Sequence, residues 1–277
     1  MIRNKKIAFV GAGFMGGALI RGLVRSQTIA SKQITASDPR DQSLSALAKE
    51  TGVNIAKDNA TAVADADIVV FAVKPQIMES VVRDLGRKIG KKKLVISIAA
   101  GVKTTAIAAW LPSGARIVRA MPNMPAAVEQ SASAICAGGS ADNVDVMTAR
   151  QMFDAVGETI EVDEKLMDAV TGLSGSGPAF VFLFLEAMID AGVRVGLDRA
   201  SARTLAAQTL YGSAKMAKLS AESPSALKDR ITSPGGTTIA GLAELEDRAF
   251  RGAVIRAVEE AVHRSRELGE GTRETSV

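Results

Sequence analysis

Short apolar runs recur along the chain through residue 162 and alternate with segments in which apolar residues have helical spacing. The runs that predict strands are Ile7–Val10, Gln33–Ser37, Ile68–Val73, Leu94–Ile98, Arg116–Val118 and Glu158–Val162. Ile68–Val73 is apolar at every position, which is typical of a strand buried on both faces. Strands that alternate with helices at this spacing predict an α/β fold with a doubly wound parallel sheet, a Rossmann arrangement.

The pattern changes in the second half of the chain, where no strand-like run follows Lys165. Helices are expected at residues 165–171, 178–193, 199–219, 224–231, 238–246 and 250–268. Two clusters of Gly, Ser and Pro, at 172–178 and 233–236, separate some of them. We therefore predict a dinucleotide-binding domain over residues 1–163 and an all-helical domain over residues 164–277.

One predicted helix is apolar around its whole circumference, because Phe180–Leu185 contains no polar residue. A helix of this kind must be buried on all sides. Burial is easiest in the middle of an oligomer, so the helical domain is expected to mediate association of subunits.

Composition narrows the function classes. The net charge is only +4, so a nucleic-acid surface is not expected, and the basic run Lys91–Lys93 is interpreted as a solvated turn. Cys136 is the only cysteine and His263 the only histidine, which argues against an internal disulfide, a metal site and Ser-His-Asp catalysis. The charged N-terminus is not expected to be a signal peptide, and Glu186 ends the apolar stretch Ala179–Leu185 well short of a membrane span. A cytoplasmic protein without membrane partners is expected.

A GxGxxG pattern lies between the first predicted strand and the first predicted helix. Its residues are Gly11, Ala12, Gly13, Phe14, Met15 and Gly16. Gly11 permits a tight turn, Gly13 lets the backbone approach a pyrophosphate, and Gly16 lets helix and strand pack closely. The helix N-terminus then offers free N–H groups to the phosphates. The pattern predicts a dinucleotide site, with a ligand-free glycine turn as the alternative.

The end of the second predicted strand carries conflicting signals about the cofactor. An acid such as Asp38 would accept hydrogen bonds from the 2′-hydroxyl of NAD, whereas Ser37 and Arg40 suit the 2′-phosphate of NADP. We expect NADP(H) to be preferred, with NAD(H) possible. Lys74 follows the strand Ile68–Val73 and is either a cofactor contact or a solvated loop lysine.

Six segments, in order along nearly the whole chain, resemble the pyrroline-5-carboxylate reductase family. They are Gly11–Gly16, Ala72–Pro75, Ala99–Val102, Arg119–Asn123, Thr171–Ala179 and Ser233–Thr238. The resemblance implies a Rossmann domain followed by a helical dimerisation domain, and NAD(P)H-dependent reduction of 1-pyrroline-5-carboxylate to L-proline. It implies a homodimer of interlocked subunits, with a ring of dimers left open, and an active site between the cofactor domain and the helical domains. The implied cofactor contacts are Gly11–Gly16, Ser37, Arg40, Asn59, Ala72, Val73, Lys74, Pro75, Ala99 and Ala100.

The two motifs of the helical half also have structural interpretations. Gly172–Pro178 is expected to be a loop in which Ser176 caps the next helix. Ser233–Thr238 is expected to be a turn that feeds a helix, with Thr237 or Thr238 as the cap. A helix N-terminus flanked by hydroxyls can also bind a carboxylate, which both proline and its precursor carry.

The resemblance implies substrate contacts at six positions. They are Glu164, Ser233, Gly235, Gly236, Thr237 and Thr238. A protonated iminium accepts hydride readily, so positioning supplies much of the rate. We expect the hydroxyl of Thr238 to orient the imine nitrogen, with the proton arriving through solvent.

Two other functions fit part of the sequence pattern. A β-hydroxyacid dehydrogenase would have a similar domain order but needs a lysine on the helix after its glycine-rich motif, and Ala179–Leu185 contains none. A dinucleotide-sensing regulator would not need a second, carboxylate-binding loop.

Overall fold

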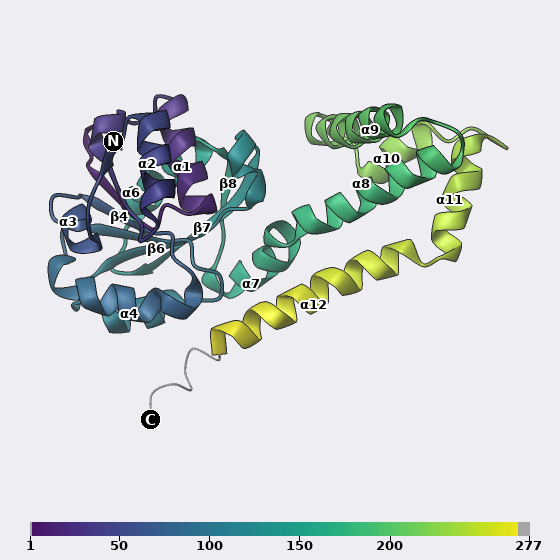
Figure 1. Ribbon diagram of the computed structural model, residues 1–277. Coiled ribbons are helices and arrows are strands. Elements are labelled where there is room, and N and C mark those ends of the chain that lie inside the picture. The colour runs from purple at the N-terminus through teal and green to yellow at the C-terminus, as the bar shows by residue number, and fades with distance from the viewer. Residues whose placement is uncertain (1, 271–277) are drawn as a thin grey trace. The chain divides into compact units, whose positions relative to one another are not determined.

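The computed structural model describes residues 2–270 (Figure 1). Its single sheet has the strand order β3-β2-β1-β4-β5-β6-β7-β8. The strands are β1 (Ile7–Val10), β2 (Ile34–Ser37), β3 (Asn54–Ile55), β4 (Ile68–Phe71), β5 (Leu94–Ser97), β6 (Arg116–Met121), β7 (Ser131–Gly139) and β8 (Gly157–Glu161). All neighbouring strands pair in parallel except β6 and β7, which are antiparallel. The predicted, largely parallel α/β sheet is therefore confirmed.

Two strands were not predicted. β7 consists mainly of Ala, Ser and Gly, so it lacks the β-branched residues that signal a strand. β3 has only two residues, and both are exposed. Tertiary pairing places these segments in the sheet, because their own sequences carry little strand signal.

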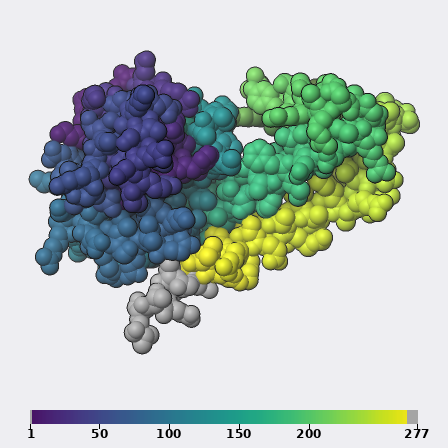
Figure 2. Space-filling view, in the orientation of Figure 1, coloured from purple at the N-terminus to yellow at the C-terminus, as the bar shows by residue number. Residues whose placement is uncertain are grey.

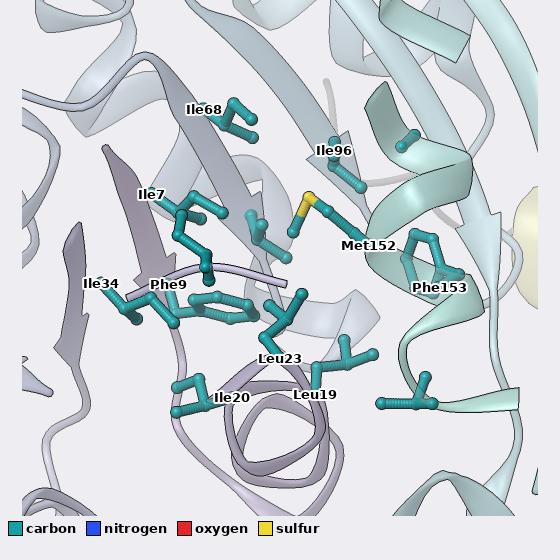
Figure 3. Close-up of a cluster of buried hydrophobic side chains, with 14 of the residues drawn as sticks. Ile7, Phe9, Leu19, Ile20, Leu23, Ile34, Ile68, Ile96, Met152 and Phe153 are labelled. Atoms are coloured by element: carbon teal, nitrogen blue, oxygen red, sulfur yellow. The ribbon is translucent and has the colours of Figure 1, made fainter. Parts of the chain in front are cut away.

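Helices cover both faces of the sheet. They are α1 (Phe14–Arg25), α2 (Asp41–Thr51), α3 (Asn59–Val63), α4 (Pro75–Leu85), α5 (Thr104–Trp110), α6 (Asn143–Asp154) and α7 (Met167–Val170). Alternate residues of β1 point to opposite faces: Ile7 and Phe9 enter one buried cluster, and Ala8 and Val10 enter the other. Figure 3 shows Phe9 packed among residues of α1 and α6, such as Leu23. The sheet thus has a core on each face, as a doubly wound fold requires.

The described residues divide into two compact units, one formed by residues 2–176 with 260–270 and the other by residues 177–259. The helices from residue 177 onward are α8 (Gly177–Arg194), α9 (Arg199–Leu219), α10 (Pro224–Arg230), α11 (Thr237–Asp247) and α12 (Phe250–Glu270). The all-helical character of this half is confirmed. The predicted boundary at 163/164 remains a prediction, and the division by contacts falls at 176/177.

The expected loop at Gly172–Pro178 is wrong. Residues Thr171–Gly175 form a π-helix, closed by a hydrogen bond from the Ser176 N–H to the Thr171 carbonyl (2.9 Å). Ser176 thus ends this π-turn, and α8 starts at Gly177. Glycine lowers helix propensity, but backbone bonding carries the helix across these glycines; single π-turns of this kind occur often at functional sites.

Helix α8 contains the all-apolar run, yet none of its residues is buried within the single chain, where its surface is visible in Figure 2. Val181 and Phe182 are each 52% exposed, and Leu183 is 68% exposed. Among residues 2–270, the stretch Glu164–Arg194 is the one helix long and apolar enough to cross a membrane by length and composition alone. An exposed apolar surface of this extent indicates an interaction site for another protein surface or for a membrane.

Candidate active site

The glycine loop after β1 is shaped by close backbone contacts. Gly11 has a φ of +97°, and a Cβ there would lie 2.6 Å from the Ala72 carbonyl oxygen. A Cβ on Gly16 would overlap the Gly11 carbonyl oxygen. Gly13 is the N-cap of α1, and a Cβ there would meet only the tip of the Arg40 side chain, at 2.9 Å. Gly11 and Gly16 are thus required by the fold, whereas Gly13 leaves space beside the helix N-terminus.

A cavity of about 780 Å³ opens at this loop, at the carboxyl ends of β1, β2 and β4. Ten of the predicted cofactor residues line it: Gly11, Gly13, Phe14, Met15, Ser37, Arg40, Asn59, Ala72, Val73 and Lys74. Ala12, Gly16, Pro75, Ala99 and Ala100 are not among the lining residues. The lining residues not predicted as contacts are Asp38, Pro39, Lys57, Asp58, Ile77 and Val81. Lys57 and Asp58 follow the unpredicted strand β3, so the sequence pattern had no means of placing them here.

The Asp38 carboxylate is surrounded by donors from its own chain. Its Oδ2 accepts the Ala12 N–H (2.9 Å) and the Arg40 Nη2 (3.1 Å). Its Oδ1 accepts the Arg40 N–H (3.0 Å) and the Arg40 Nε (2.9 Å). Burial alone would raise the pKa of Asp38, but the hydrogen bonds from Arg40 and Ala12 outweigh it and lower that pKa. Asp38 therefore ties the glycine loop to Arg40, and its acceptor positions are taken.

Ser37 and Asn59 form a second pair in the cavity wall. The Ser37 hydroxyl donates to Asn59 Oδ1 at 2.7 Å, with the Phe9 carbonyl as a longer alternative at 3.4 Å. Ser37 is only 2% exposed. Its hydroxyl is engaged within the chain and orients the Asn59 amide at the start of α3.

Strand β6 and the two residues after it contact the segment that follows residue 163. Arg119, Met121 and Asn123 are two residues apart and approach successive parts of this segment. Arg119 Nη1 lies 3.4 Å from Glu164 Oε1, and the Asn123 amide donates to the Ser174 carbonyl (3.0 Å). A Cβ on Gly175 would lie 2.7 Å from Met121 Cε.

Three sequence-distant motifs therefore meet here: Arg119–Asn123, Glu164 and the π-helix. The π-helix is positioned by the Asn123 amide and by the close approach of Met121 to Gly175. Pattern alone had suggested only a loop at this place.

The turn Ser233–Thr238 belongs to the second unit. Gly236 is the N-cap of α11 and makes no side-chain capping bond, and Thr237 and Thr238 are the first two helical residues. The expectation that Thr237 or Thr238 caps this helix is wrong, because the helix begins one residue earlier than predicted. The turn itself is closed by the Gly236 N–H to the Ser233 carbonyl (3.1 Å) and uses Gly235 at a φ of +65°. The N–H groups of the first turn of α11 are therefore available to an anion.

Comparisons with known proteins agree with this architecture. A family model described as pyrroline-5-carboxylate reductase dimerisation matches residues 164–268, and one described as NADP oxidoreductase, coenzyme F420-dependent, matches residues 6–101. The pyrroline-5-carboxylate reductase of Methanosarcina acetivorans is 48% identical and covers 97% of this chain and 99% of its own. That of Escherichia coli is 40% identical, with 96% and 98% covered.

Solved structures give the same result. The Plasmodium falciparum pyrroline carboxylate reductase with NADP bound has a TM-score of 0.88 at 36% identity, with 96% of this chain and 99% of that chain covered. The pyrroline-5-carboxylate reductase of Coxiella burnetii has a TM-score of 0.90 at 36% identity, with the same coverage. Relatives this similar extend over both the nucleotide half and the helical half, so the chain belongs to the pyrroline-5-carboxylate reductase family.

Proposed function

We propose that this protein reduces the C=N bond of 1-pyrroline-5-carboxylate to give L-proline. A nicotinamide dinucleotide supplies the hydride, which adds to the imine carbon, and a proton from solvent ends on the ring nitrogen. The observation that carries the proposal is the glycine-lined cavity at the carboxyl edge of the sheet, in a chain that matches this family over both halves. Ligands of doubly wound sheets bind at this edge.

The residues at the cavity suit a dinucleotide. Gly13 leaves open the space that a side chain would fill, and the N-terminus of α1 offers the free N–H groups of Phe14, Met15 and Gly16 to a pyrophosphate. Ala72, Val73, Lys74 and Pro75 follow β4 at the same edge and complete the proposed cofactor contacts, together with Ser37, Arg40, Asn59, Ala99 and Ala100. The chemistry of the reaction belongs to the cofactor, so the protein's task is to orient it.

NADP(H) is the preferred cofactor in this proposal, with NAD(H) as the weaker one. In NAD enzymes an acid after the second strand accepts from the ribose 2′-hydroxyl, but the acceptor positions of Asp38 are already used. The Arg40 side chain is 61% exposed at the cavity, and Lys57 lines the same cavity. Both cations suit a 2′-phosphate. The Plasmodium falciparum relative with NADP bound agrees with this choice.

The substrate carboxylate is assigned to the turn before α11. Gly236 and Thr237 present N–H groups at the helix N-terminus, and Ser233 and Thr238 add hydroxyls. Gly235 supplies the backbone bend. Thr238 orients the imine nitrogen, and its hydroxyl is not used as the helix cap. Glu164, which the resemblance adds to this set, instead has both carboxylate oxygens engaged by Thr104.

Assembly follows from the helical half, whose family model describes dimerisation. The exposed apolar surface of α8 is assigned to a homodimer interface rather than to lipid. Glu186, Asp190 and Arg194 recur every four residues in the same helix, and charged groups are costly inside a bilayer. The proposed assembly is a homodimer, with a ring of dimers as its larger form, in a cytoplasmic enzyme that binds neither membrane nor nucleic acid.

The deciding experiment is a turnover assay on the purified full chain. The absorbance of the reduced nicotinamide is followed with 1-pyrroline-5-carboxylate, once with NADPH and once with NADH. Substrate-dependent oxidation that is more efficient with NADPH supports the proposal. Oxidation of a β-hydroxyacid with NADP⁺ in place of imine reduction would instead support the dehydrogenase alternative.

A further inference from the structure

Arg119 is a buried cation at the end of the parallel part of the sheet. It lies on β6 directly beside Ser97, the last residue of β5. Its side chain is only 3% exposed, and its Nη2 is a buried nitrogen with no hydrogen-bond partner among the described residues. Its charge is paired with the Glu164 carboxylate at 3.4 Å, the one ion pair that Arg119 makes within residues 2–270, and an unpaired buried charge is costly.

Glu164 binds the start of α5 as well as Arg119. Its Oε1 accepts the Thr104 N–H and its Oε2 accepts the Thr104 hydroxyl, each at 2.7 Å. Thr104 is itself held tightly from the other side, because a Cβ on Gly138 of β7 would overlap the Thr104 side chain. The carboxylate therefore fixes the residue at which α5 begins.

Ser97 and Thr104 are the two ends of one loop, residues 98–103, which contains Ala99 and Ala100. The loop turns at Gly101, whose φ is +76°. At the first end the strand register places Arg119 next to Ser97, and at the second end Glu164 holds Thr104. The Arg119–Glu164 ion pair joins these two anchors.

We infer that Arg119 and Glu164 are positioning residues: their ion pair fixes both ends of the loop 98–103. This loop follows β5, the parallel neighbour of β4, at the carboxyl edge of the sheet, so it places the proposed cofactor contacts Ala99 and Ala100 beyond the lining of the cavity, where the nicotinamide half would extend. This inference rests on the proposed function. It gives Glu164 a role different from substrate contact. The adenosine half, assigned here to Arg40 and Asn59, lies against the lining of the cavity, which includes no residue of the loop 98–103, so it is independent of the pair.

The first test is Glu164→Gln, with Asp163→Asn as its matched control. The amide keeps one acceptor for the Thr104 N–H but loses the charge that pairs with Arg119. The Asp163 side chain is 70% exposed and its ion-pair partner among the described residues, Lys165 (3.0 Å), is 77% exposed, so loss of the Asp163 charge breaks no buried ion pair. The KM values for NADPH and for 1-pyrroline-5-carboxylate are measured, together with the dissociation constant of adenosine 2′,5′-bisphosphate, which probes the adenosine half alone.

Glu164→Gln is expected to raise the KM for NADPH by about tenfold, less than the roughly hundredfold effect that a misplacement of about 1 Å can have, because the amide still accepts the Thr104 N–H. The affinity for adenosine 2′,5′-bisphosphate and the KM for the imine should stay at the wild-type values, and Asp163→Asn should behave as wild type. An increase confined to the KM of the imine would show that Glu164 contacts substrate and would overturn the inference. A lower Tm with unchanged kinetics would also overturn it.

Two further variants keep the test decisive if Glu164→Gln folds poorly. Thr104→Val removes only the hydroxyl donor and retains the N–H, so it should raise the KM for NADPH in the same direction but less. Thr105→Val, at the exposed next position of the same helix, is its control and should change nothing. Unaltered cofactor kinetics in Thr104→Val would contradict the inference.

A double-mutant cycle tests the pair itself. If Arg119 and Glu164 act as one unit, Arg119→Met combined with Glu164→Gln should weaken NADPH binding no more than either change alone. Additive losses would overturn the claim that they act together. A wild-type enzyme that fails to oxidise NADPH with 1-pyrroline-5-carboxylate would refute the proposed function rather than this inference.

Discussion

Gly13→Val separates the nucleotide-binding role of the glycine loop from its structural role. The new side chain would stand at the N-cap of α1, where the helix N–H groups face the cavity. The nearest atom to its Cβ is Arg40 Nη2, at 2.9 Å, the far end of a side chain that is 61% exposed. This nitrogen can move into solvent at the cost of its hydrogen bond to Asp38 Oδ2, while Arg40 Nε keeps its bond to Oδ1. The free energy of unfolding should therefore change little.

The affinity for NADPH should fall much more than the free energy of unfolding. The Gly17 N–H makes the first bond of this helix, to the Gly13 carbonyl (2.8 Å), so the preceding N–H groups are free for a pyrophosphate. A hydrogen bond to a charged group is worth about 1.5–3 kcal/mol, so losing two of them costs at least about 3 kcal/mol. At about 1.4 kcal/mol per tenfold, NADPH should bind at least about a hundredfold more weakly.

The assay is a fluorescence titration of NADPH, paired with urea unfolding of the same sample. Gly16→Ala is the contrasting variant, because its Cβ would overlap the Gly11 carbonyl oxygen and overpacking of this kind costs about 1–3 kcal/mol of stability. Wild-type NADPH affinity in a correctly folded Gly13→Val protein would refute the assignment of the pyrophosphate to this loop. Severe unfolding of Gly13→Val would refute the view that its environment is open.

Four further outcomes are expected. Thr238→Ala should reduce kcat/KM by an amount equivalent to about 1–3 kcal/mol of transition-state stabilisation. The free energy of unfolding should not change, because Thr238 is not the cap of α11, and Thr238→Ser should keep the activity. A destabilised but fully active Thr238→Ala protein would contradict this. The wild type should sediment as at least a dimer, and Leu183→Glu should shift it toward monomer, because this exposed leucine would carry a charge into the interface. The folded pKa of Asp38 lies below its ordinary value of 3.8, so its contribution to stability is complete above that value and is lost as the pH falls through the folded pKa; Asp38→Asn should flatten the acid limb of the stability–pH profile. Burial raises the pKa of Cys136 to about 11, so its thiol should resist thiol reagents at neutral pH until urea unfolds the chain.

Six of the eight strands of the described sheet, the glycine loop and the change to an all-helical second half could be predicted from sequence. Each of these depends on residues close together in the chain. The apolar run of β4 indicates burial on both faces by its own composition. Within six positions, the spacing of Gly11, Gly13 and Gly16 predicts a tight turn, a close approach of the backbone to a pyrophosphate and a close helix–strand contact. The carboxyl-edge location of the cavity then follows because the glycine loop comes directly after β1, and ligands of doubly wound sheets bind at the carboxyl ends of the strands.

Strand β7 and the π-helix depended on the tertiary structure. β7 carries small residues without strand preference and is ordered by its pairing with β6 and β8. The glycines of Thr171–Gly175 indicate a break, yet the Asn123 amide and the Met121 side chain hold this segment in a helical turn. Local propensity is a weak preference that partners distant in the chain can override.

The roles of individual charged residues also depend on the tertiary structure. Sequence marks Asp38 as an acid near a ribose, but the fold brings the Ala12 N–H to it from 26 positions away and occupies its oxygens together with Arg40. The sequence singles out Glu164 only by resemblance, and the fold brings the Thr104 N–H, 60 positions away, to donate to its carboxylate. A chain pattern shows which groups are present and which face they occupy, because these follow from the repeat of a helix or strand. Which donor meets which acceptor depends on loops and strand order, and only the folded chain determines that.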